Sequence, residues 1–281
     1  MAIDSIVKKY RINEYLDIID KIEADLEKYT LEHPFESARD YKNLLFHTMK
    51  KSIVTIKEIL ILCSEGYSDG AISLSRNLYE QLVTVIFFEI HKKDQDFQDY
   101  VYDYYLDFDI QQSKRRKKYF ELVEHDKEQA HEIESEIQKL KEKAKYKGAK
   151  GDGKQVGKDW WWTRQNSFMN MESATIDRYI DFDSDKPQIL GLLKFSHKLA
   201  CTSIHAGCLG NTERFGEEFD FSVLYTGNSD RGQSACLFAT CASFNRLCIL
   251  FYRYLDIEYR YELGLSELAC FYVNENNFKP Q

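Results

Sequence analysis

The sequence contains few of the residues that interrupt regular secondary structure. Among its 281 residues are only three prolines and 13 glycines. A β-sandwich or a doubly wound sheet uses these two residue types for many of its turns. Their scarcity disfavours both architectures. It predicts an all-α fold of long antiparallel helices, which we assign to a single domain over residues 1–281.

Segments that would direct the chain into a membrane are also missing. The opening, MAIDSIVKKYRINEYLDIID, shows no charged-then-apolar pattern before a small-residue cleavage site. The longest apolar runs, Ile59–Cys63 and Leu82–Phe88, are far shorter than the roughly 20 residues that span a bilayer. We therefore expect a cytoplasmic protein with no membrane partner.

Sequence motifs of closely spaced cysteines are absent too. The seven cysteines are an odd number, and none forms a C-x-x-C motif. Six lie within helical patterns, and Cys208 lies at the end of one. Free buried thiols in a reducing compartment explain this distribution better than disulfides do.

The charge balance is acidic, with a formal net charge of −8. Such a balance repels nucleic acid on average. One stretch, Lys139–Lys158, is basic instead, because it contains eight lysines. A solvated helix end followed by a linker explains this stretch most simply. The alternative is an electrostatic contact with nucleic acid or with an acidic protein partner.

Apolar residues recur at helical spacing through most of the chain. They predict an N-terminal helix within 1–35, core helices within 36–124 and 159–281, and a projecting charged arm with a Gly/Lys-rich loop at 125–158. Trp160–Trp162 should re-anchor the chain on the core after that loop. The aromatic helices and the polar arm also predict a homodimer.

The expected helices are 3–31, 36–65 with a C-cap at Gly66, 70–92 capped by Ser68 and Asp69, one long charged helix from about 94, 169–176, 187–207, 233–259 and a short C-terminal one.

The helix at 70–92 carries the most informative polar residues. It is apolar on two opposite sides, so it should be central, yet Arg76 and Glu80 lie one turn apart on one of those sides. Losing either partner of such a half-buried pair would cost several kcal/mol. One interpretation is a structural ion pair that fixes helix register. The other is a guanidinium held ready for a phosphate or carboxylate, with the glutamate as orienter or base.

A second candidate is the helix LLKFSHKLACTSIHAG, which carries Ser196, His197, Ser203 and His205. His205 shares a face with Cys201 and Cys208, as a metal site would require. Positions seven apart on a helix are separated by about 10.5 Å, however, too far for one tetrahedral ion unless the helix ends between them. A satisfied core histidine is therefore favoured over a zinc ligand, and we expect no metal and no cofactor.

Two motif look-alikes do not hold. GAKGDGK at 148–154 matches the spacing of a phosphate-binding loop, but Gln155 replaces the Ser or Thr that would hold magnesium. The R-x4–6-H pattern of helical HEPN ribonucleases is also missing, because Arg76 is followed by Gln, Leu and Val at 81–83. A ribonuclease of that type would need its histidine from another helix.

Three segments together resemble a bacterial family known as domain of unknown function 5677. They are AISLSRNLYEQ at 71–81, WWWTRQNSFMNME at 160–172, and KFSHKLACTSIHAG at 194–207, and the resemblance spans about residues 40–255. It implies an all-helical fold without an established activity. It also implies that Arg76 and Glu80 converge with Ser203 and His205 on one polar site. The long lysine-rich insertion at about 125–158 departs from the family pattern.

Three function classes follow. The first is an interaction or regulatory protein, as in a bacterial stress or phage-defence system, in which the polar pair is structural or binds a small anion. The second is a metal-independent ribonuclease or phosphodiesterase, with His205 as general acid or base and Arg76 stabilising phosphate charge. The third is a metal-dependent hydrolase that uses Glu80, His205 and nearby carboxylates.

Overall fold

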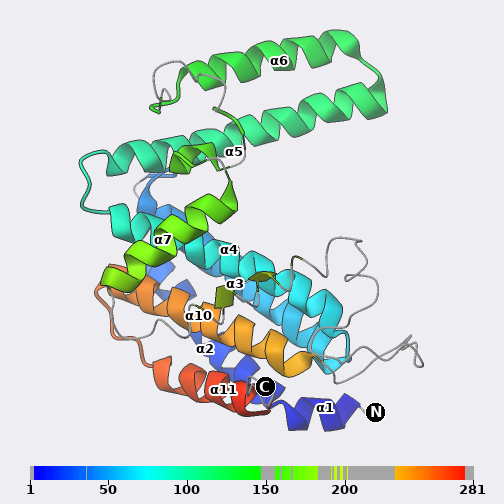
Figure 1. Cartoon of the computed structure of the whole chain (residues 1–281), viewed down its shortest axis with the longest axis vertical. Coiled ribbons are helices and arrows are strands. Elements are labelled where there is room, and N and C mark those ends of the chain that lie inside the picture. Colours follow the sequence, from blue (N-terminus) through cyan, green and yellow to red (C-terminus); the bar gives the residue numbers. More distant parts are fainter. Residues whose placement is uncertain are drawn as a thin grey trace. The chain divides into compact units, whose positions relative to one another are not determined.

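The fold was determined as a computed structural model and is all-α (Figure 1). Every element of regular structure in the part of the chain it describes is a helix or a helical turn, which confirms the predicted fold class. The described residues are 3–35, 37–146, 156–158, 160–165, 167–182, 191, 193–194, 197–198, 201 and 232–275.

The chain divides into two compact units. The first comprises Met1–Glu36, Leu45–Ile86 and Asp183–Gln281, and the second comprises Ser37–Leu44 and Phe87–Phe182. The chain crosses between them four times, and two of the crossings fall inside continuous helices, α3 (Tyr41–Ser64) and α4 (Ser68–His91). Because these two crossings lie within helices and not at a Pro/Gly-rich linker, helical spacing alone does not predict the division.

The first unit is a layered set of helices around a core to which α10 (Gln233–Leu255) contributes most. It also contains α1 (Ile3–Lys9), α2 (Ile12–Glu32), most of α3 and α4, and α11 (Glu262–Glu275). Nearly all of α10 is buried, and α11 packs against it. By length and composition α10 is apolar enough to cross a membrane, but 89% of its most apolar window is buried inside the protein, as in the core helix of a soluble protein.

The predicted single helix at 3–31 is wrong in one respect. The chain breaks at Arg11, which adopts a left-handed conformation with φ 52°, and this divides the segment into α1 and α2. The helical spacing of apolar residues in this segment does produce a buried face, formed by Ile6, Tyr10, Tyr15, Ile19, Ile22 and Leu26.

The junction between α3 and α4 is set by one glycine. Gly66 has φ 83°, Tyr67 N donates to Leu62 O at 2.8 Å, and Gly66 N donates to Cys63 O at 3.1 Å. This pattern is a Schellman C-cap, which confirms the predicted end of the helix. The predicted start of α4 was two residues late, because Ser68 and Asp69 belong to its first turn instead of capping it.

The second unit contains a helical hairpin where the sequence predicted one long charged helix. α5 (Phe97–Tyr119) ends in a π-helical turn, Phe120–Glu124, and α6 (Lys127–Glu142) returns antiparallel beside it (Figure 1). His125 takes a left-handed conformation with φ 54°, and Asp126 caps α6 by accepting from Gln129 N at 2.9 Å. The single-helix prediction is therefore wrong, because the capping residue Asp126 restarts the helix in a new direction.

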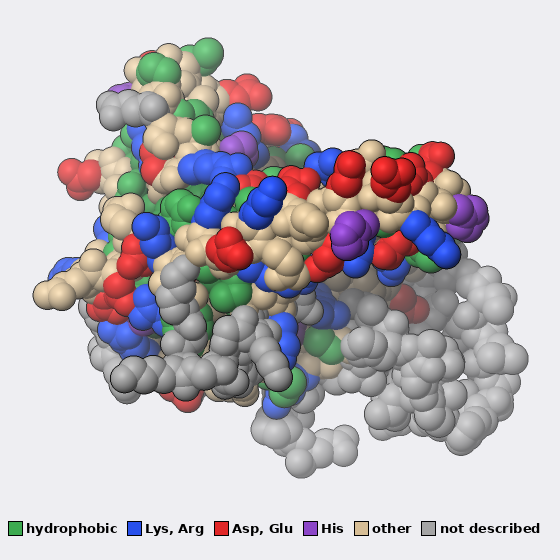
Figure 2. Space-filling model, turned by 90° about the horizontal axis from the view of Figure 1, so that it is seen from above, with side chains coloured by type: hydrophobic (Ala, Val, Ile, Leu, Met, Phe, Trp, Pro, Cys, Tyr) green, Lys and Arg blue, Asp and Glu red, His purple; other side chains and the backbone are tan. Residues whose placement is uncertain are grey.

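The charged helix α6 is attached to α5 through a narrow apolar stripe. Ala130, Ile133 and Ile137 are buried at helical spacing, while Lys117 pairs with Glu134 at 2.9 Å across the hairpin. Figure 2 shows the face over α6, where basic and acidic side chains are interspersed and form no field of a single sign. The proposed contact of the lysine-rich stretch with nucleic acid or an acidic protein stays a prediction, and residues 147–155 of that stretch lie outside the described part of the chain.

Trp162 is the centre of an aromatic cluster in the second unit. It stacks on Phe88 with ring centroids 5.4 Å apart and planes 6° apart, and it meets Phe87 and Tyr104 edge-on at 5.3 and 5.0 Å. Trp161 is buried beside it and donates from Nε1 to Asp107 at 2.7 Å. The tryptophan segment thus anchors the chain on the core of its unit, as the sequence predicted.

Candidate functional site

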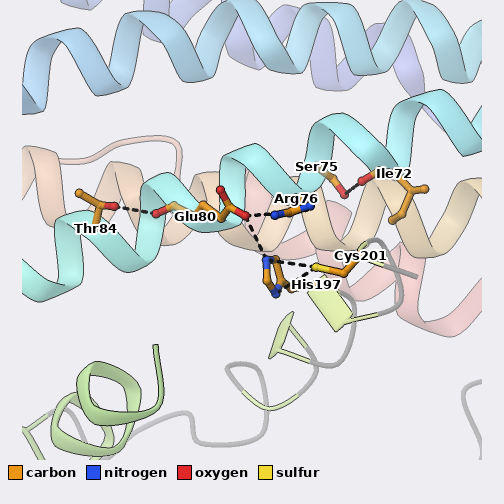
Figure 3. A network of polar contacts seen from close by, with 7 residues as sticks. All are labelled: Ile72, Ser75, Arg76, Glu80, Thr84, His197 and Cys201. Carbon is orange, nitrogen blue, oxygen red and sulfur yellow. Dashed lines mark hydrogen bonds and ion pairs between the residues drawn. The ribbon is translucent and has the colours of Figure 1, made fainter. Parts of the chain in front are cut away.

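The site is built on α4 within the first unit. Arg76 Nε donates to Glu80 Oε1 at 2.7 Å, and the two side chains are 29% and 21% exposed. The neighbouring hydroxyls are satisfied by the helix itself: Ser75 donates to Ile72 O, and Thr84 donates to Glu80 O, each at 2.8 Å (Figure 3). The pair is therefore half-buried at the predicted one-turn spacing.

His197 completes the pair from a distant part of the chain. Its Nε2 lies 3.4 Å from Glu80 Oε1, so one carboxylate oxygen faces both the guanidinium and the imidazole (Figure 3). The histidine side chain is only 6% exposed. The ring of Tyr79 covers it, with centroids 4.9 Å apart and planes tilted by 37°. α4 thus supplies the carboxylate that orients the ring and the aromatic wall that packs against it.

The electrostatics of the pair favour charged forms of both partners. Burial raises the pKa of Glu80, but hydrogen bonds from His197 and Arg76 outweigh it and hold that pKa below its ordinary value. Burial lowers the pKa of Arg76, but the hydrogen bond to Glu80 and its charge leave that pKa above the ordinary value. At neutral pH the site contains a carboxylate and a guanidinium.

Cys201 lies beside the histidine, one turn further along its segment. Its Sγ is 4.0 Å from Nδ1 and 3.8 Å from Nε2 of His197 (Figure 3). The described residues of the predicted helix at 187–207, including His197 and Cys201, are helical, so the i, i+4 spacing places both on one face. The thiol is partly exposed.

The predicted site residues are only partly accounted for. Arg76 and Glu80 meet as expected, but Ser203, His205 and Cys208 lie outside the described residues. The histidine that the structure brings to Glu80 is His197. A sequence signal for it existed, because the spacing of His197 and Cys201 places both on one helix face, although the shared face of His205, Cys201 and Cys208 suggested a metal site instead.

The described residues include side chains of the types that bind metal ions. No group of three or more His, Cys, Asp or Glu side chains among those residues has the arrangement that could hold a metal ion. The metal-dependent hydrolase was to use His205, which lies outside those residues.

The guanidinium has binding capacity beyond its partner. The guanidinium of Arg76 has five N–H donors, which can form paired contacts along two edges of the group. Among the described residues, it donates from Nε to Glu80. The edge formed by Nη1 and Nη2 has the spacing that matches a carboxylate or a phosphate. The carboxylate of Glu80 at Nε therefore fixes the orientation of the guanidinium.

Comparison with known proteins identifies one family. A family of unknown function, DUF5677, matches residues 42–222. This range contains Arg76, Glu80 and His197, and it agrees with the family resemblance drawn from the motifs. No curated protein matches the chain, and no solved structure matches it.

Proposed function

Because the chain belongs to the DUF5677 family, whose function is unknown, we propose from the chemistry of its site that the protein is a cytoplasmic interaction or regulatory component that binds a small anionic group. The ligand is a phosphate or a carboxylate, and Arg76 is the residue that binds it. A place in a bacterial stress or phage-defence system is part of this proposal.

The observation that supports the proposal is the one-edge contact of Arg76 with Glu80. The bond at 2.7 Å holds the guanidinium in one orientation before any ligand arrives. A preorganised guanidinium loses less side-chain entropy on binding than a mobile one does. Its 29% exposure leaves part of the group open to solvent, so an anion can reach it without the core opening.

The neighbouring carboxylate weakens the attraction for an anion without removing it. Glu80 balances the charge of Arg76, so specificity must come from the geometry of the donors more than from net charge. The ring of His197 lies 3.4 Å from the same Glu80 oxygen, so a second polar group contacts the carboxylate. We therefore expect millimolar to micromolar affinity for a simple anion, about −4 to −8 kcal/mol.

Isothermal titration of the purified protein with inorganic phosphate tests the proposal. We expect saturable binding that Arg76→Ala abolishes and Arg76→Lys weakens, because lysine cannot form the two-donor contact. Arg39→Ala is the matched control, since Arg39 is also held by a carboxylate, Asp109, at 2.7 Å, but in the second unit. Unchanged binding in Arg76→Ala would reject the proposal, as would the absence of phosphate and carboxylate binding by the wild type.

The second candidate function is metal-independent phosphodiester cleavage. The specific observation that favours it is that His197 and Arg76 contact the same Glu80 oxygen; the predicted role of His205 lies outside the described residues. An imidazole that a carboxylate orients can move a proton, and an arginine can stabilise the developing phosphate charge. In this function the bound anion is a phosphodiester of RNA.

Expression of the protein in cells separates the two functions. A ribonuclease would arrest growth, and His197→Ala and Arg76→Ala would each relieve the arrest while the protein remains folded. If phosphate binds at Arg76 but neither growth arrest nor RNA cleavage occurs, the binding function stands and the nuclease is rejected.

A further inference from the structure

The six described cysteines occupy three different environments. Four are buried in the core of the first unit: Cys63, Cys236, Cys241 and Cys248. Burial raises the pKa of the Cys241 thiol and of the Cys248 thiol far above the ordinary range, so both should be inert. Cys270 is exposed, and Cys201 is partly exposed.

Cys201 alone among these six lies against the Arg76–Glu80–His197 cluster. Its sulfur is within 4.0 Å of both nitrogens of His197. Its charge also acts on the arginine of the cluster, because burial lowers the pKa of Arg76 whereas Glu80 and, more weakly, a thiolate at Cys201 raise it. Cys201 therefore lies within electrostatic reach of the guanidinium.

Among the described residues, the charged and titratable groups of the cluster around Cys201 come from two segments. α4 contributes Arg76, Glu80 and Tyr79, and the segment of Cys201 contributes His197. Glu80 repels a thiolate, but its charge is shared between Arg76 and His197. The pairing of a thiol with an imidazole oriented by a carboxylate is the arrangement that activates cysteine nucleophiles.

We propose that Cys201 is the reactive thiol of this protein and a site of covalent modification by small electrophiles, and that its modification blocks anion binding at Arg76. The claim that modification blocks anion binding rests on the proposed function. The claim that Cys201 is reactive does not. The contact of Sγ with His197 carries the inference, together with the partial exposure of the thiol.

Alkylation of Cys201 by iodoacetamide is a substitution reaction that needs no oxidant or reductant. The thiolate sulfur attacks the methylene carbon, an S–C bond forms, the C–I bond breaks and iodide leaves. The proton released by the thiol passes to His197 or to water. The sulfur that carries the added group lies within 4.0 Å of the imidazole, so we expect the group to compete with an anion at Arg76.

Measured labelling rates test the reactivity. The protein is treated with limiting iodoacetamide between pH about 6 and 9, and each cysteine is quantified by peptide mass spectrometry, with fragment ions separating Cys201 from Cys208. Although it is less exposed, Cys201 should react at least about tenfold faster than Cys270 near pH 6.5, with a shallow pH dependence. The rate at an ordinary thiol, in contrast, rises about tenfold per pH unit below its pKa.

His197→Gln supplies the decisive comparison, because glutamine can still donate to Glu80 but cannot become a cation. It should slow labelling of Cys201 by about tenfold and leave Cys270 unchanged. Unlabelled Cys241 and Cys248 report that the core of the variant is intact. Equal rates and equal pH slopes at Cys201 and Cys270 would overturn the inference. So would fast labelling of Cys201 that His197→Gln does not slow.

Titration of the alkylated protein with inorganic phosphate tests the claim that modification blocks anion binding. Loss of phosphate binding after labelling of Cys201 is the expected result, and unchanged affinity would overturn the regulatory role. If unlabelled protein never binds phosphate while Cys201 is reactive, the proposed function and its regulation fail, and the reactive thiol stands.

Discussion

His197 Nε2 lies 3.4 Å from Glu80 Oε1, although 117 residues separate the two in sequence. The contact joins the C-terminal part of the first unit to α4, the helix that carries Arg76. It makes one carboxylate the shared acceptor of an arginine and a histidine. The chemistry proposed for this protein depends on that shared oxygen.

Replacement of Glu80 by glutamine should lower stability in a pH-dependent way. The pKa of Glu80 in the folded state is lowered, so its carboxylate stabilises the fold above the unfolded pKa of about 4.3, and this contribution is lost as pH falls through the folded pKa. The gap in urea midpoint between wild type and Glu80→Gln should be full at pH about 7 and narrow toward pH about 3. A gap that stays constant or widens on acidification would contradict the assigned charge state.

Arg76 and Glu80 should be energetically coupled. Removing the guanidinium leaves a partly buried carboxylate with one donor fewer, which should cost about 1–3 kcal/mol. Arg76→Met and Glu80→Met together should cost less than the sum of the single changes, with a coupling energy of about 1 kcal/mol. Urea denaturation of the three variants measures it, and strict additivity would show that the bond at 2.7 Å contributes nothing to stability.

Trp162→Ala should destabilise the second unit strongly. The side chain is 3% exposed and is packed between Phe87, Phe88 and Tyr104, so its truncation should cost about 3–5 kcal/mol. The matched control is Trp160→Ala, because Trp160 is only partly buried and should lose much less. Equal urea midpoints for the two variants would contradict the anchoring role of Trp162.

Asp103 should hold the end of the α5–α6 hairpin. It is 2% exposed, and its carboxylate accepts from Lys145 N at 2.8 Å and from Tyr146 N at 2.9 Å. Asp103→Ala should leave these amides without their acceptor, so their hydrogen exchange should accelerate by about tenfold or more. Unchanged exchange at both amides would show that other contacts hold this end. Exchange in α10 should be unaffected and serves as the internal reference.

The sequence predicted the helices well where apolar spacing is regular and poorly where a single residue redirects the chain. The apolar faces of α2 and α4 follow from a 3.6-residue period, and Gly66 marks a helix end by its freedom to adopt positive φ. Arg11 and His125 take left-handed conformations without being glycine. The residue type at these two positions does not predict a left-handed conformation, so the sequence did not predict the breaks after α1 and α5.

The site was predictable only as far as it is local. Arg76 and Glu80 are one turn apart, and their contact follows from helix geometry alone. Local spacing could not predict that His197 faces Glu80, because that contact depends on tertiary packing. The i, i+4 relation of His197 to Cys201 was visible in the sequence. Its packing against Tyr79 was not.

The most direct test of the anion-binding proposal observes the arginine itself. In nuclear magnetic resonance spectra of protein labelled with 15N-arginine, the Nε–H of Arg76 is identified by its loss in Arg76→Lys. Addition of inorganic phosphate should shift this signal in a saturable manner while the Nε–H of Arg39 stays in place. A phosphate titration that leaves the Arg76 signal unmoved would contradict the proposal that this guanidinium binds an anion.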